Sequence, residues 1–154
     1  MKKIIVALLT LIFSHTVFAA GITIGPLTNY AANADEYGVD EGCSFQYPRQ
    51  KNKTMALTDI EYKHLWMNLN GVDVKFNLAK SVADDLNTDK KGSKNIKIYE
   101  YGALTVELVN TFVAPPRTKR QTMGDWRLYN VSGTFKINDG KETKIVQTKG
   151  ECSY

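Results

Sequence analysis

The chain has 154 residues, with 20 basic and 16 acidic side chains, a formal net charge of +4 and 43% hydrophobic residues. This length suits one domain with a core of its own, and the small basic excess gives no reason to expect a nucleic-acid partner. Of the two histidines only His64 lies outside the N-terminal segment 1–19, and the two cysteines are expected to pair with each other, so we expect no metal and no cofactor.

Residues 1–19 have the pattern of a secretory signal peptide. A basic pair, Lys2-Lys3, precedes an apolar run from Ile4 to Phe13, and Val17-Phe18-Ala19 places small residues where a signal peptidase cuts. We expect cleavage directly after this triplet, with cleavage one residue later as the alternative. The short basic start favours a bacterial exporter. The apolar run is shorter than the ~20 residues of a membrane span, so we expect a periplasmic or secreted protein, with no membrane span and a single β domain over residues 20–154.

Residues 20–42 have little pattern. Residues 21–24 could form a short edge strand, which Gly25-Pro26 would end. The segment 35–41 carries four carboxylates without the ligand spacing of a calcium loop. We interpret it as a solvated arm; the alternatives are a cation site or an acidic contact for a basic partner.

Cys43 and Cys152 are expected to pair in an oxidising compartment. Each is followed two positions later by an aromatic residue, so that cysteine and aromatic share one face of a strand. A disulfide would bring the first and last strands of the domain together. The alternative, a redox-active thiol pair, lacks a Cys-x-x-Cys turn.

The strongest local pattern is Asn70-Gly71 between two alternating segments, 64–69 and 72–78. Asn-Gly favours a two-residue type I′ hairpin turn, and a slip of one residue would expose the whole apolar face, so the register is predicted too. That apolar face would hold Leu65, Met67, Leu69, Val72, Val74 and Phe76. The opposite face would hold His64, Trp66, Asn68, Asp73, Lys75 and Asn77.

The other elements follow from periodicity. Residues 43–47 predict a strand and residues 49–53 a polar connection, whereas Leu78–Leu86 has the apolar spacing of about two helical turns. Alternating segments at 96–101 and 104–113 and a strand that starts at Trp126 come next, and Asn138-Asp139-Gly140 predicts a three-residue turn with Gly140 left-handed, followed by a strand to Cys152. We therefore predict an all-β fold, an antiparallel sandwich or small barrel of seven to eight strands, with at most one short helix and the disulfide Cys43–Cys152.

The sequence has neither a Gly-x-Ser-x-Gly elbow nor a glycine-rich phosphate loop. We therefore expect a protein that is not an enzyme. The better lead is Trp66, which is unexpected on a polar face. With His64 and Lys75 it would form a binding platform, with the Lys75 ammonium near the indole. The alternative is that the N-terminal segment or a second sheet covers Trp66.

The loop 114–125 is the second candidate binding site. Pro115-Pro116 cannot continue a β-ladder, and Arg117, Lys119 and Arg120 put three positive charges into four residues, shortly before Trp126. Such a loop would suit an acidic cleft of another protein or an anionic envelope polymer. The alternative is a solvated connection.

In size, compartment and composition the chain resembles small exported bacterial β-proteins with one disulfide, such as periplasmic lysozyme inhibitors and toxin-immunity proteins, although it carries no motif of either. The resemblance implies binding to another exported protein, which is our first hypothesis. The alternatives are an envelope-associated small-ligand carrier or hydrolase that uses a carboxylate or His64, and a structural envelope protein. A deep apolar pocket converging on carboxylates would favour the carrier or hydrolase, and a filled interior would oppose it.

Overall fold

The structure is a computed structural model that describes residues 21–29, 42–85, 90–114 and 128–153. All regular elements within these ranges are β-strands. They are β1 (Ile24–Gly25), β2 (Cys43–Tyr47), β3 (Gln50–Thr58), β4 (His64–Leu69), β5 (Val72–Asp85), β6 (Lys94–Tyr101), β7 (Leu104–Ala114), β8 (Leu128–Asn138) and β9 (Thr143–Ser153).

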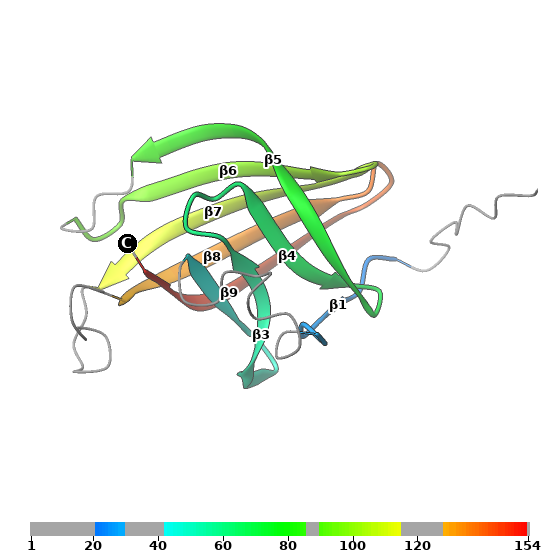
Figure 1. The fold of residues 1–154 in the computed structure, drawn as a ribbon, viewed down its shortest axis with the longest axis horizontal. Helices are drawn as coiled ribbons and strands as arrows, with labels where there is room; N and C mark the ends of the chain where they lie inside the picture. Colours follow the sequence, from blue (N-terminus) through cyan, green and yellow to red (C-terminus); the bar gives the residue numbers. More distant parts are fainter. Residues whose placement is uncertain (1–20, 30–41, 86–89, 115–127, 154) are drawn as a thin grey trace, which may run out of the picture.

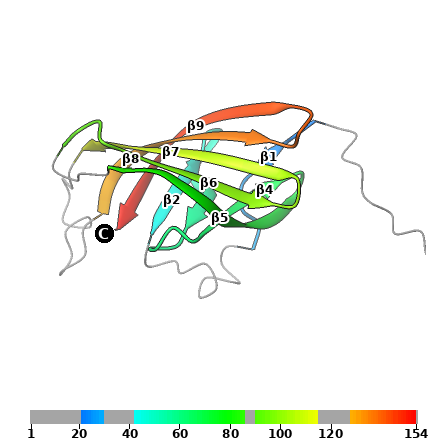
Figure 2. The same ribbon diagram turned by 90° about the horizontal axis from the view of Figure 1, so that it is seen from above.

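Strands β2 to β9 form a closed antiparallel barrel. Each strand pairs with the next along the chain, and β9 pairs back on β2, so that the meander returns to its start (Figure 1). The short β1 pairs with the end of β4 that β3 leaves uncovered, with Ile24 opposite Leu69. Seen from above, the strands wrap around a common interior (Figure 2). The predicted fold class is confirmed in its barrel form, with eight barrel strands and one extra strand among the described residues.

The central hairpin has the predicted register. Leu65 lies opposite Phe76, and the turn residues Asn70 and Gly71 both have positive φ, 53° and 84°, as a type I′ turn requires. Of the predicted apolar face, Leu65, Met67, Leu69 and Phe76 are buried and Val74 is half-buried. The expectation was wrong for Val72, which is 61% exposed because it lies beside the turn, at the rim of the barrel.

Two element predictions were wrong. The Leu78–Leu86 segment is not helical where it is described: residues 78–85 continue β5 and pair with β6. Its register shifts between Leu78 and Lys80 and again between Ser81 and Ala83, and such bulges break strict alternation in the sequence. The polar residues 50–53 belong to β3, because the β2–β3 connection is a tight turn at Pro48-Arg49.

Large side chains fill the barrel. On the inward face of β8, Val131, Phe135 and Ile137 are almost completely buried and Tyr129 is 9% exposed. The ring of Phe45 crosses this face, with its centroid 4.9 Å from that of Phe135 in an edge-to-face arrangement. The largest fully buried side chains are Tyr99, Phe45, Phe76, Phe112, Phe135, Met55, Leu65 and Met67.

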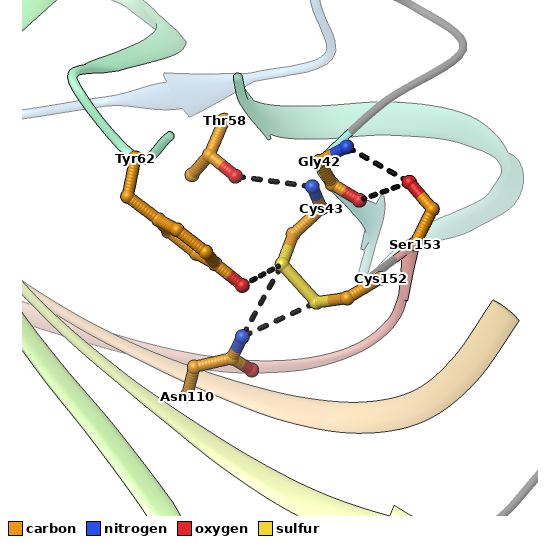
Figure 3. The surroundings of a disulfide bond; sticks show 7 residues. All are labelled: Gly42, Cys43, Thr58, Tyr62, Asn110, Cys152 and Ser153. Carbon is orange, nitrogen blue, oxygen red and sulfur yellow. Dashed lines mark hydrogen bonds between the residues drawn. A yellow bond between two sulfur atoms is a disulfide. The ribbon is translucent and has the colours of Figure 1, made fainter. Parts of the chain in front are cut away.

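The disulfide Cys43–Cys152 joins the first and last barrel strands, as predicted. The two cysteines lie opposite each other in the β2–β9 ladder, and both are buried. Figure 3 shows the donors around the sulfur atoms: the Tyr62 hydroxyl lies 3.0 Å from Cys43 Sγ, and Asn110 Nδ2 lies 3.3 Å from Cys43 Sγ and 3.2 Å from Cys152 Sγ. The disulfide is therefore a buried part of the barrel closure.

Candidate functional site

The predicted platform residues come together on the outer face of β4 and β5. The Lys75 ammonium lies 5.3 Å from the centroid of the Trp66 ring, and the His64 and Trp66 rings lie 5.6 Å apart. However, Trp66 is only 3% exposed, because it is packed with Leu27 and Leu57. The structure thus supports the alternative in which the N-terminal segment covers the indole, and a binding role for the three residues stays a prediction.

The N-terminal segment is fastened to the outside of the barrel by Asp73. The Asp73 carboxylate accepts hydrogen bonds from the backbone N–H of Thr28 at 2.9 Å, from the N–H of Asn29 at 2.9 Å and from Asn68 Nδ2 at 2.6 Å. Partial burial by itself would raise the pKa of Asp73, but the hydrogen bonds from Asn29, Asn68 and Thr28 outweigh it and hold the pKa below its ordinary value. Leu27 is thereby held over Trp66.

His64 makes a polar contact typical of an acid–base pair. Its Nδ1 lies 2.7 Å from Asp59 Oδ2, and both side chains are partly exposed. A general base also needs a substrate placed within its reach. None of the three recesses described below is lined by His64 or Asp59; the pair joins the start of β4 to the β3–β4 connection.

A groove lies where β9 and β2 diverge. The two strands pair only from Cys43–Phe45 to Gly150–Cys152, and then β2 turns away at Pro48-Arg49 (Figure 1). Over Thr143–Lys149, β9 pairs with β8 and with no other described strand. A recess of about 440 Å³ lies beside this part of β9. It is lined by Thr23, Ile24, Tyr47, Pro48, Arg49, Met55, Lys144, Ile145, Val146 and Gln147.

The N-terminal segment forms one wall of this groove. Lys144 Nζ donates a hydrogen bond to the carbonyl oxygen of Ile22 at 2.6 Å, and the Tyr47 hydroxyl lies 3.4 Å from the Ile24 carbonyl oxygen. The lining contains the cations of Arg49 and Lys144 and no carboxylate. The groove is therefore positively charged and has apolar walls.

A second recess of about 320 Å³ lies on the other side of the same segment, between the β4–β5, β6–β7 and β8–β9 turns. Its lining is mainly apolar, and Tyr101, 55% exposed, stands at its edge. The lining residues are Ile22, Leu69, Asn70, Val72, Val74, Tyr101, Leu104 and Asp139. A third recess, also of about 440 Å³, lies on the outer face of β7 to β9 and includes Lys91 and Lys149.

A buried lysine was not predicted. Lys97 is 6% exposed; its Nζ lies 3.0 Å from Ser81 Oγ and 5.6 Å from the centroid of the Tyr62 ring. The alternation of residues 96–101 favours an inward position for the apolar Ile96 and Ile98 and an outward one for Lys97, but in the structure the two isoleucines face outward. The buried Asn95 and Asn110, which face each other across β6 and β7 near Lys97, show that the interior is polar at the disulfide end.

The second predicted binding site cannot be placed in the same way. Arg117, Lys119, Arg120 and Trp126 lie outside the described residues, as do residues 1–19. The flanking ends of β7 and β8, at Ala114 and Leu128, lie at the disulfide end of the barrel, since Leu128 pairs with Ser153. The described strand ends on either side of the loop thus lie at the end of the barrel opposite to the second recess.

No family model, no curated protein and no solved structure matches this chain. Within the described ranges, no three His, Cys, Asp or Glu side chains gather in a way that could hold a metal ion. The same ranges contain no helix long and apolar enough to cross a membrane.

Proposed function

We propose that this chain is an exported, non-catalytic β-barrel that binds another exported protein through its outer surface. The observation that carries this proposal is the filled interior. Eight-stranded barrels either fill their interior with side chains or enclose one small ligand. Here Phe45, Phe76, Tyr99 and Phe135 occupy the interior, which leaves the outer surface and the rim for recognition.

The export part of the proposal rests on two features. Residues 1–19 have the pattern of a signal peptide, and the domain is closed by a buried disulfide, a bond that persists in oxidising compartments. Two cations and no carboxylate line the groove beside β9, which favours a partner surface with acidic groups.

The alternative functions receive less support. A small-ligand carrier needs a chamber, and the interior holds large aromatic side chains instead. A hydrolase that uses His64 needs a recess beside it, and the His64–Asp59 pair lines none of the recesses described here.

The test is capture with the disulfide-bonded mature chain, residues 20–154, as bait in an extract of proteins exported by the cells that produce it. We expect one exported protein to be retained in a 1:1 complex that re-forms from purified components, and not to be retained by an unrelated disulfide-bonded β domain. In parallel, native mass spectrometry of the chain isolated from that compartment should show the mass of the protein alone. A small molecule bound in stoichiometric amount, with no retained protein, would contradict the proposal.

A further inference from the structure

The first half of β9 is an unpaired sheet edge in a barrel that is otherwise closed. From Thr143 to Lys149 this strand pairs with β8 on one side, and no described strand pairs with its other side. An open edge presents backbone N–H and C=O groups that can pair with another chain, which natural proteins usually prevent. Closed barrels have no such edge, so this interruption of the β2–β9 ladder needs an explanation.

The edge carries two lysines, Lys144 and Lys149, but few other protective features. It is seven residues long and contains no proline, and its outward residue Ile145 is 62% exposed. The Lys144 ammonium is held by the Ile22 carbonyl oxygen. The last ladder pair between β2 and β9 is Phe45–Gly150. Just beyond it, the Thr148 hydroxyl donates a hydrogen bond to the Gln46 carbonyl oxygen. The groove begins where the two strands then separate.

The groove beside the edge has the features of a strand-binding site. It has a volume of about 440 Å³, with Tyr47, Met55 and Val146 as apolar lining and with Arg49 and Lys144 as positive charges. Strand addition gains affinity from backbone hydrogen bonds and specificity from alternate side chains. The positive charges favour an acidic occupant, and they oppose pairing between two copies of this chain, because like charges would then face each other.

We propose that the β9 edge, Thr143–Gln147, accepts an extended acidic segment of a partner protein as an additional β-strand. This inference rests on the proposed function, since it names the surface and the kind of segment by which the partner is bound. Apolar side chains of the segment enter the groove beside Tyr47 and Val146, and its carboxylates lie near Arg49.

The experiment uses a displayed library of random linear 12-residue peptides as the probe, selected against the mature chain. We expect enriched peptides in which Asp or Glu alternates with β-branched or aromatic residues. A synthetic peptide of this kind should slow amide hydrogen exchange in Thr143–Gln147. Its affinity should fall about tenfold or more in Arg49→Glu, by charge reversal at the groove, and change little in Val82→Glu, a control that adds a carboxylate at an exposed position of β5. Equal melting temperatures of both variants and the wild type would show that folding is intact.

The proposal would be overturned by enriched peptides without carboxylates, by protection confined to other strands, or by equal affinity in Arg49→Glu and Val82→Glu. Protection of Thr143–Gln147 in the free chain that is lost when residues 35–41 are replaced by a Gly-Ser linker would also overturn it, because the chain's own acidic segment would then be the occupant.

The proposed function, binding of an exported protein, is tested separately from the β9 edge. If an exported protein is captured and its complex is unaffected by Arg49→Glu, the chain is a binding protein that uses another surface. If no exported protein is captured, the proposed function fails whatever the peptides show.

Discussion

Gly133 lies directly against the ring of Phe45, so closely that no residue with a Cβ atom fits there without a shift. An added Cβ on Gly133 would lie 2.6 Å from Phe45 Cε1 and 2.9 Å from Phe135 Cε2. Gly150 presses on the same ring from β9, where an added Cβ would lie 2.7 Å from Phe45 Cδ1. Two glycines thus make room for the aromatic side chain that fills this part of the barrel.

Gly133→Ala should therefore destabilise the barrel by about 1–3 kcal/mol, the usual cost of overpacking a well-packed core. Denaturant unfolding followed by circular dichroism would measure this. Thr134→Ala, on the outward face of the same strand, is the matched control and should cost less than about 1 kcal/mol. Equal stability of both variants would mean that Phe45 does not lie against Gly133.

Leu27→Ala should loosen the N-terminal segment and expose Trp66. Leu27 is 9% exposed and belongs to the small cluster that buries the indole. Loss of its side chain should weaken the docking of the segment by about 2 kcal/mol, and water should then reach the ring. In a Trp126→Phe background, the Trp66 fluorescence should shift to longer wavelength. An unchanged spectrum would show that Leu27 does not cover the indole.

The free energy of unfolding should depend on pH through Asp73. The folded-state pKa of Asp73 is lowered, whereas an unfolded aspartate titrates near ~3.9. Its contribution is therefore present above that value and is lost as the pH falls through the folded-state pKa. Asp73→Asn should thus destabilise the protein most above about pH 5, and the difference from the wild type should shrink in more acidic solution.

Asp139→Asn is the control for this pH dependence. Backbone N–H groups of Glu142 and Lys141 lower the pKa of Asp139 as well, so its contribution is lost in the same direction. Asp139 does not hold the segment over Trp66, however. Acid should therefore shift the Trp66 fluorescence in the wild type and in Asp139→Asn alike, while Asp73→Asn should already show the shifted spectrum at neutral pH. A normal spectrum for Asp73→Asn would contradict the fastening role.

Removal of the disulfide should cost about 4–5 kcal/mol, because closing so long a loop restricts the unfolded chain strongly; the two cysteines are 109 residues apart. The double variant Cys43→Ala/Cys152→Ala also removes the acceptors of Tyr62 and Asn110. Urea unfolding of this variant should show a midpoint far below that of the wild type. Equal midpoints would show that the β2–β9 ladder keeps the barrel closed without the disulfide.

The parts of the fold that sequence reasoning predicts are those with one dominant local signal. Asn70-Gly71 has a turn chemistry that few other dipeptides share, and it sets the β4–β5 register. The two cysteines could only pair with each other. The β5 bulges lack such a signal, and apolar spacing around Leu78 reads as a helix because two register shifts alter the alternation.

Burial depends on contacts that are distant in sequence. The alternation at 96–101 does not show which set of side chains faces inward. Lys97 belongs to the inward set, where its ammonium contacts the Ser81 hydroxyl and the Tyr62 ring. The cover over Trp66 comes from Leu27, across a segment with little sequence pattern. The groove beside β9 forms where β9 separates from β2. These two strands lie far apart in the sequence, so no local pattern predicts the groove.

Binding through the outer surface is tested most directly by the nuclear magnetic resonance spectrum of the isotope-labelled chain in complex with its captured exported partner. We expect chemical shifts to change on the outer surface, foremost at Ile145, Gln147 and Arg49, while the signals of the inward side chains Phe45 and Phe135 keep their positions. Changes confined to the inward side chains, with the outer surface unchanged, would contradict binding through the outer surface.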